Sequence, residues 1–368
     1  LAANEYYTYD KIESTLHAWQ DDYGQNIHPV FEDYGIIYNL DTIGFSSQNA
    51  FPIFAVKLTS DANLPKQDKP RVLILGQCHA EEIYGVEISM RIIECFLDPE
   101  KCWNDFIGIR PYLLNILEKS LDKVELWVVP THNPEGLKVV HGYCDENISS
   151  TEAACNGNWI EDPTFRKNIR DANNNGKFIE GQDFERVVGY DEDGVDLNRN
   201  YDINWIHGHS YKQNTNSKNP CYDDNYDLYR GETPFSETEI QAIDSLSRAN
   251  TYFLSIAYHS SRSGSIAEHV IFPWGWKDTG QSEHNRKRSP DYSIIEKLGD
   301  KIRSTLEFSP EALVPQTSRT GNAHDWLYRE TGCIQYLIEV GEFNYQNCLT
   351  NLPPDYIDPD NDLLIDNK

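Results

Sequence analysis

His79 and Glu82 lie three residues apart in the stretch "GQCHAEEIYG" (76–85), directly after the apolar run "RVLIL" (71–75). Imidazole and carboxylate groups bind zinc in hydrolases, where three protein ligands leave one position open for water. Taken alone, this spacing is weak evidence, because chance matches are common and a surface His/Glu pair is the more frequent explanation. The stretch therefore predicts part of a metal site and requires a further ligand elsewhere.

A third candidate ligand, His259, follows the apolar run "YFLSIAY" (252–258). A lone histidine after an apolar strand is more often structural than a ligand. Open α/β sheets, however, bind their ligands at the carboxyl ends of strands. Because both candidate segments follow such runs, we expect His79, Glu82 and His259 to meet at one edge of a sheet and to hold one zinc ion.

Short apolar and β-branched runs alternate with helical patterns along the chain. The strands expected from these runs are 71–76, 125–130, 252–258, 268–273 and 335–340. Nearly all-apolar strands separated by helices indicate an α/β sheet that is covered on both faces. A helix is expected from about 82 to 97, and Ser236 with Glu239 predicts a capping box at the start of another helix.

The composition is that of a globular protein, with 39% hydrophobic and 12% aromatic residues. A formal net charge of −27 argues against nucleic acid or an anionic membrane as a partner. No apolar run reaches the roughly 18 residues that a membrane span needs. We expect a secreted, monomeric protein in an extracellular or periplasmic compartment.

Several of the eight cysteines occur in short polar loops, and none has the CxxC spacing of zinc ribbons. We expect local disulfides and hence an oxidising compartment. The expected pairs are Cys95–Cys102, Cys144–Cys155 and Cys333–Cys348, with Cys78 unpaired. The alternative is a set of free, buried thiols.

Two acidic stretches are candidates for calcium. The stretch "DANNNGKFIEGQD" (171–183) opens like an EF-hand loop, with oxygen ligands at alternate positions: Asp171, Asn173 and Asn175. Gln182 stands where the bidentate glutamate of such a loop would be expected. The C-terminal "DPDNDLLIDNK" (358–368) resembles the start of a thrombospondin type 3 calcium-binding repeat. For both stretches the alternative is a solvated acidic turn.

Eight motifs in matching order make the chain resemble the M14 family of zinc carboxypeptidases. They are "HAEE" (79–82), "THNPEG" (131–136), "FRKNIRD" (165–171), "GVDLNRNY" (194–201), "YRGETPFSETE" (229–239), "YHSS" (258–261), "GNAHDWLY" (321–328) and "YLIEVG" (336–341). The resemblance implies a single α/β domain, a mixed eight-stranded sheet with helices on both faces. We expect the catalytic domain to cover 1–357 and an acidic tail to follow over 358–368.

The resemblance also assigns roles to residues. His79, Glu82 and His259 match the zinc ligands of the family, and Glu339 matches its catalytic glutamate. The apolar setting of Glu339 in "CIQYLIEVG" supports a special role, because an unpartnered buried carboxylate is costly. Arg166 matches the arginine that polarises the scissile carbonyl and stabilises the oxyanion.

Asn198 and Arg199 match the pair that binds the terminal carboxylate of the substrate, for which arginine offers a bidentate fork. His324 falls where the family sets its preference for the C-terminal side chain of the substrate. We expect a preference for polar or acidic side chains, and the alternative is that His324 is a packed histidine at a helix cap. The chain departs from the family at three positions: His324 is neither an apolar nor an acidic specificity residue, Thr317 replaces a tyrosine, and Glu81 replaces an arginine found in many members.

These features predict a zinc metallocarboxypeptidase that hydrolyses the C-terminal bond of peptides or proteins, with Glu339 as the general base for a zinc-activated water. The first alternative is an amidohydrolase of peptidoglycan stem peptides, which the missing tyrosine favours. The second is a non-catalytic peptide-binding module of the same fold. The presence of Glu339 and of all three ligands argues against this second alternative.

Overall fold

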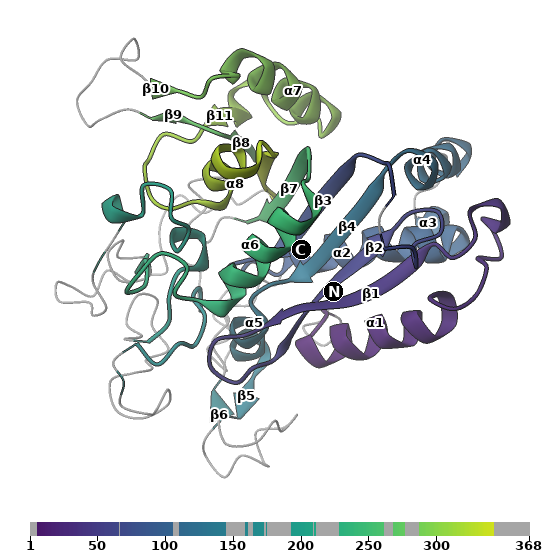
Figure 1. The fold of residues 1–368 in the computed structure, drawn as a ribbon, viewed down its shortest axis with the longest axis horizontal. Helices are drawn as coiled ribbons and strands as arrows, with labels where there is room; N and C mark the ends of the chain where they lie inside the picture. The colour runs from purple at the N-terminus through teal and green to yellow at the C-terminus, as the bar shows by residue number, and fades with distance from the viewer. Residues whose placement is uncertain are drawn as a thin grey trace, which may run out of the picture.

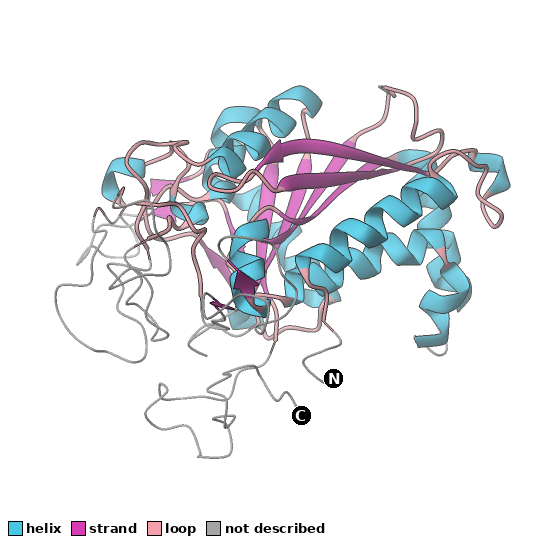
Figure 2. Ribbon diagram, turned by 90° about the horizontal axis from the view of Figure 1, so that it is seen from below, coloured by secondary structure: helices cyan, strands magenta, loops and turns pink. Residues whose placement is uncertain are grey.

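The fold is described from a computed structural model of the chain. The structure describes residues 6–65, 67–105, 110–144, 159–160, 165–172, 174, 193–208, 210, 228–260, 268–276 and 287–341. These residues form a central sheet with helices packed on its two faces (Figure 1; Figure 2).

Eight strands form one mixed sheet in the order β1-β2-β4-β3-β7-β12-β8-β11 (Figure 1). In that order their bounds are β1 (Tyr38–Phe45), β2 (Pro52–Leu58), β4 (Glu125–Thr131), β3 (Arg71–Gln77), β7 (Leu254–His259), β12 (Ile334–Glu339), β8 (His269–Phe272) and β11 (Leu313–Pro315). The central strands β4, β3, β7 and β12 run parallel, whereas β2 and β8 pair antiparallel with this group. The expected mixed eight-stranded sheet is confirmed.

Helices cover both faces of this sheet (Figure 2). Their bounds are α1 (Tyr9–Tyr23), α2 (Tyr84–Leu97), α3 (Pro99–Asp105), α4 (Arg110–Lys123), α5 (Pro134–His141), α6 (Thr238–Asn250), α7 (Tyr292–Thr305) and α8 (Ala323–Thr331). Two short strand pairs lie outside the sheet: β5 (Tyr143–Cys144) with β6 (Trp159–Ile160), and β9 (Gly275–Trp276) with β10 (Lys287–Arg288). Among the described helices, none combines the length and the apolar character needed to cross a membrane.

The strand β3 is buried on both sides because successive side chains of a strand point to opposite faces. Ile74 belongs to one apolar core with Met90 of α2. Leu73 and Leu75 belong to the opposite core with Ile243 of α6. A strand covered on both faces needs apolar residues at nearly every position, which explains the continuous run "RVLIL".

The start of α6 differs from the expected capping box. Glu237 is the N-cap residue, and no side chain caps the first backbone N–H groups. Ser236 Oγ instead donates to Glu237 Oε1 at 2.8 Å, and Glu239 accepts from the backbone N–H of Ser47 at 3.1 Å. The capping prediction was wrong because these side chains make tertiary contacts in preference to local ones.

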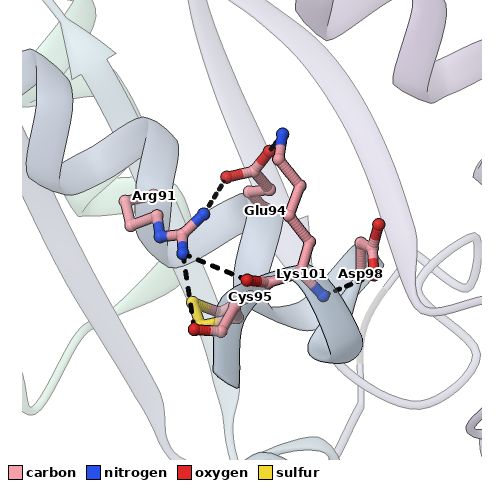
Figure 3. Close-up of a disulfide and its surroundings, with 6 residues drawn as sticks. Arg91, Glu94, Cys95, Asp98 and Lys101 are labelled. Carbon is pink, nitrogen blue, oxygen red and sulfur yellow. Dashed lines mark hydrogen bonds and ion pairs between the residues drawn. A yellow bond between two sulfur atoms is a disulfide. The ribbon is translucent and has the colours of Figure 1, made fainter. Parts of the chain in front are cut away.

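A disulfide joins the end of α2 to α3 (Figure 3). It links Cys95 to Cys102, as expected from their proximity in the sequence. Arg91 supports the same turn, because it forms an ion pair with Glu94 and donates to the carbonyl oxygens of Lys101 and Cys102 at 3.5 and 3.4 Å. Covalent and polar contacts therefore hold α2 and α3 together.

The other cysteine predictions have mixed outcomes. Cys78 is a free, buried thiol, as expected. Cys333 is also free and buried, which contradicts the predicted bond to Cys348, a residue outside the described part of the chain. The physical reason is that Cys333 packs into an apolar core at the start of β12. The predicted Cys144–Cys155 pair falls on side chains that the structure does not describe.

Candidate metal centre and active site

Three predicted ligands meet at the carboxyl edge of the central sheet. His79 and Glu82 lie in the segment that follows β3, and His259 is the last residue of β7. The strands β3 and β7 are parallel neighbours, so their carboxyl ends lie side by side. The sheet topology therefore brings together residues that are 180 positions apart in the sequence.

The contacts within this triad fit a shared cation. The Nδ1 atom of His79 lies 2.8 Å from Glu82 Oε1, and the Nδ1 atom of His259 lies 2.6 Å from Glu82 Oε2. The two Nδ1 atoms are 3.1 Å apart, and one ligand atom from each of the three residues falls within 4.8 Å of the others. All three side chains are buried. Two imidazole nitrogens and a carboxylate that converge in this way are a ligand set that zinc takes, so the residues present fit the metal.

Asp196 contacts Nε2 of His79, the ring nitrogen that does not face Glu82 and His259. Its Oδ1 atom lies 3.1 Å from His79 Nε2. Burial alone would raise the pKa of Asp196, but Arg166, Arg199 and His79 lower it well below its ordinary value. A carboxylate on the second nitrogen of a metal-binding histidine fixes the tautomer and the ring orientation. Reasoning from the sequence did not single out Asp196, although it lies within the motif "GVDLNRNY".

Arg166 lies beside the triad on the segment 165–170. Its Nε atom donates to Asp196 Oδ2 at 3.1 Å, and its Nη2 atom lies 2.9 Å from His79 Nε2. Its Nη1 atom is 3.4 Å from Glu82 Oε1 and 3.6 Å from Glu81 Oε1. Glu81, which stands where many relatives of the resembled family carry arginine, is thus an acidic partner of Arg166.

Glu339 is the last residue of β12 and is aligned in register with His259 of β7. Its Oε2 atom is buried and has no hydrogen-bond partner among the described residues. Burial, with a smaller contribution from Glu82, raises the pKa of Glu339 to about 8. A carboxyl group that exchanges its proton near neutral pH is suited to general acid–base chemistry.

Asn198 and Arg199 lie in a short 3-10 helix, η4 (Leu197–Arg199), next to the start of α8. Asn198 Oδ1 accepts from the N–H of Ala323 at 2.9 Å, which leaves its Nδ2 atom as the group that can donate to a ligand. Arg199 Nη1 donates to the carbonyl oxygen of Asn198 at 2.9 Å and to Asn322 Oδ1 at 3.3 Å. The two residues are therefore oriented by each other and by α8.

His324 is the second residue of α8 and is buried. Neither of its ring nitrogens has a hydrogen-bond partner in the described part of the chain. Burial, together with His259 and Arg199, lowers the pKa of His324 to about 3, so the imidazole is neutral. The imidazole of His324 is thus a neutral hydrogen-bond donor and acceptor, and it lies close enough to His259 and Arg199 for their charges to affect its pKa.

A third histidine near the triad, His132, was missed by the sequence reasoning. It follows β4, and its Nδ1 atom has no partner among the residues that the structure describes. Burial, with His259 and His79, lowers the pKa of His132 to about 3. The signal was present in the motif "THNPEG" (131–136), which follows an apolar run in the same way as the other two histidines.

The calcium prediction falls largely outside the described residues. Asn173, Asn175 and the stretch 358–368 are not described, and Asp171 is half-buried. Within the described part of the chain, the triad of His79, Glu82 and His259 forms a group arranged for a metal ion, and Asp171 belongs to no such group.

Comparisons with known proteins agree with the geometry of this site. The model of a family described as zinc carboxypeptidase matches residues 25–363. Mast cell carboxypeptidase A of Rattus norvegicus is 26% identical over 238 residues, which cover 63% of this chain and 46% of that protein. The inactive metallocarboxypeptidase ECM14 of Uncinocarpus reesii (strain UAMH 1704) is 22% identical over 230 residues, 58% of this chain and 32% of that protein. The chain thus spans about half or less of the length of these curated relatives.

A solved structure shows the same fold. The carboxypeptidase A from Helicoverpa armigera superposes with a TM-score of 0.59 at 15% sequence identity. The match covers 97% of this chain and 70% of that one.

Proposed function

Because the chain belongs to the zinc carboxypeptidase family, we propose that it is a metallocarboxypeptidase that removes the C-terminal residue of peptides or proteins. The observation that carries the proposal is the convergence of His79, Glu82 and His259 beside the buried carboxyl of Glu339. One matching relative is named an inactive metallocarboxypeptidase, so the fold alone does not establish activity. The proposal therefore rests on the residues of the site.

His79, Glu82 and His259 would hold the zinc ion. When bound, zinc activates water and polarises the scissile carbonyl. Asp196 accepts a hydrogen bond from Nε2–H of His79 and thereby keeps the Nδ1 lone pair directed at the centre of the triad. The carboxylate of Glu82 faces both Nδ1 atoms, which fixes the spacing of the ligand set.

Glu339 is the proton carrier in this proposal. Its carboxylate takes a proton from the attacking water and delivers it to the nitrogen of the leaving amine. The raised pKa of Glu339 supports this role, because the group must both accept and release a proton near neutral pH.

Arg166 is the proposed electrophilic group. Its guanidinium would donate to the scissile carbonyl oxygen as negative charge develops there. Contacts with Asp196 and Glu82 hold the guanidinium beside the triad before substrate arrives. Such preorganised donors cost little reorganisation during the reaction.

Asn198 and Arg199 are proposed to bind the terminal carboxylate of the substrate, which would make the enzyme an exopeptidase. His324 would contact the C-terminal side chain. Its neutral imidazole can both donate and accept a hydrogen bond, which favours a polar or acidic side chain.

We further propose that the protein is secreted and acts as a monomer. The disulfide between Cys95 and Cys102 supports an oxidising compartment. The predicted division into a catalytic domain over 1–357 and an acidic tail over 358–368, with calcium bound near Asp171, remains part of this proposal.

The decisive experiment measures release of free amino acids from ordinary L-peptides. We expect release that stops on chelation and returns on addition of zinc, with the same loss in the variant His259→Ala. The same preparation is assayed on muropeptides, because Thr317 replaces the family tyrosine and a peptidoglycan amidohydrolase is the alternative. Release from muropeptides alone would select that alternative, and no release from either substrate would contradict the proposed activity.

A further inference from the structure

Two buried carboxylates at the start of α6 share the same hydrogen-bond partners. Glu237 is 1% exposed and Glu239 is fully buried. Asn168 Nδ2 donates to Glu237 Oε2 at 2.7 Å and to Glu239 Oε1 at 3.2 Å. Ser47 Oγ lies 2.9 Å from Glu237 Oε2 and also makes a short contact with Glu239 Oε2. The two carboxylates therefore face each other across one amide and one hydroxyl.

The hydrogen atoms available at this point favour an additional proton. The Ser47 hydroxyl carries one hydrogen, so it can donate a linear hydrogen bond to only one of the two carboxylates that it contacts. The second contact is a hydrogen bond only if the other carboxyl group itself carries a proton. Two ionised carboxylates so close together in a buried setting would also repel each other strongly.

The groups that surround the pair supply no balancing charge. From α5, Glu135 adds a third buried carboxyl group, and the segment 228–236 contributes Tyr229. Within the described part of the chain, neither carboxylate of the pair forms an ion pair with a lysine, an arginine or a histidine. Burial, followed by Glu237 and Glu135, raises the pKa of Glu239 to about 8.

Asn168 connects this pair to the candidate active site. It lies two residues after Arg166, and its Oδ1 atom accepts from the N–H of Val195 at 2.8 Å. Val195 directly precedes Asp196, whose carboxylate holds both Arg166 and His79. The side-chain amide of Asn168 thus links the segment that carries Arg166 to the segment that carries Asp196, and Glu237 and Glu239 hold this amide in place.

We propose that Glu237 and Glu239 hold one proton between them and act as a positioning pair that keeps Arg166 in register with Asp196. The catalytic consequence rests on the role proposed above for Arg166, whereas the shared proton does not. When the pair loses this proton, the two charges repel, and the segment that carries Asn168 moves away from α6. Arg166 then loses its place beside the triad.

The test compares the variant Glu239→Gln with the wild type between pH 6 and pH 9. Glutamine is neutral and supplies an N–H in place of the carboxyl proton, so the variant mimics the protonated pair. The melting temperature of the wild type should fall as the pH rises through this range, because a carboxyl group with a raised pKa stabilises the fold only while it stays protonated. In the variant this fall should be reduced. The matched control Glu296→Gln, at an exposed position of α7, should keep the wild-type dependence.

Kinetics distinguish positioning from stability. The titration of Glu339 affects the wild type and Glu239→Gln alike, so the test is the ratio of the wild-type kcat to the kcat of the variant. A group that titrates near pH 8 is roughly one-tenth protonated at pH 9, so this ratio should be about tenfold lower at pH 9 than at pH 7. KM should change little with pH in either protein, because only the group that polarises the carbonyl is displaced.

Each outcome decides the proposal. Equal melting curves against pH in the wild type and Glu239→Gln would overturn the shared proton. Failure of both Glu239→Gln and Glu237→Gln to fold would also overturn it, because either amide supplies the missing hydrogen. If the melting temperature of Glu239→Gln falls less with pH but the ratio of the wild-type kcat to the variant kcat is the same at pH 7 and pH 9, the shared proton is supported and the positioning of Arg166 is rejected. If the wild type hydrolyses no peptide, the melting series still decides the shared proton, so the two failures are distinguishable.

Discussion

At the scale of single residues, the role proposed for Glu339 predicts that metal binding and turnover can be separated. In Glu339→Gln the three ligands are untouched, so zinc content by elemental analysis should equal that of the wild type. The proton carrier is lost, and kcat should fall by roughly 10²- to 10⁴-fold. The control Glu118→Gln, at an exposed position of α4, should be fully active. A fully active Glu339→Gln would reject the proposed base.

Asp196 is expected to act through His79. In Asp196→Asn the side chain keeps its size but loses its charge, so it holds the tautomer of His79 less firmly and no longer forms an ion pair with Arg166. We expect zinc affinity, measured by competition with a chelator, to fall roughly 10- to 100-fold. Asp202→Asn is the matched control, because Asp202 is half-exposed and pairs with Arg329 at the surface. Equal zinc affinity in the two variants would show that Asp196 does not orient the ligand.

The predictability of the site differs from residue to residue. His79, Glu82 and His259 were found from their own types and from the strands that precede them. His132 follows a strand in the same way, so the same signal was present, but the prediction ended with the three ligands that a zinc site needs. Asp196 contacts His79, which lies 117 positions away in the sequence. Such a contact depends on tertiary packing and cannot be read from the spacing of residues within a motif.

At the scale of elements, five of the eight strands of the sheet were predicted, because burial on both faces of a sheet demands apolar residues in succession, whereas β1, β2 and β11 were missed. The expected segments 71–76 and 125–130 correspond to β3 and β4. The capping box at Ser236 failed because Glu239 is buried against Ser47 and Asn168. Local sequence propensity predicts the start of a helix poorly where the side chains make tertiary contacts instead of capping the helix.

The link between α2 and α3 gives a prediction for stability. Replacing both bonded cysteines in Cys95→Ser/Cys102→Ser removes a short covalent loop and should lower the free energy of unfolding by about 2 kcal/mol. Urea denaturation of the variant and of the wild type with its disulfide intact measures this difference. The peptidase activity should remain, because the bond joins α2 to α3 away from the triad. Equal unfolding midpoints would mean that the polar contacts of Arg91 hold the turn without the bond.

At the scale of the whole molecule, the net charge of −27 should affect encounter with substrate. Oppositely charged partners associate faster at low ionic strength, where the Debye length is long. Two peptides with the same C-terminal residues, one lysine-rich and one glutamate-rich upstream, provide the comparison. We expect kcat/KM of the lysine-rich peptide to fall several-fold between about 0.01 and 1 M salt and that of the other peptide to rise. The same salt response for both peptides would reject charge steering.

The alignment of β3 with β7 also bears on how the protein matures. His79 and Glu82 are neighbours in the sequence, but His259 joins them across 180 residues, so two ligands exist in any state of the chain and the third only once the centre of the sheet has closed. An unfolded or half-synthesised chain therefore offers zinc a weak bidentate site. Because the metal would bind the closed sheet in preference to partly folded chains, it should shift the folding equilibrium toward the native state. Acquisition of the ion would therefore follow closure of the sheet, and the proposed peptidase activity would require the complete sheet.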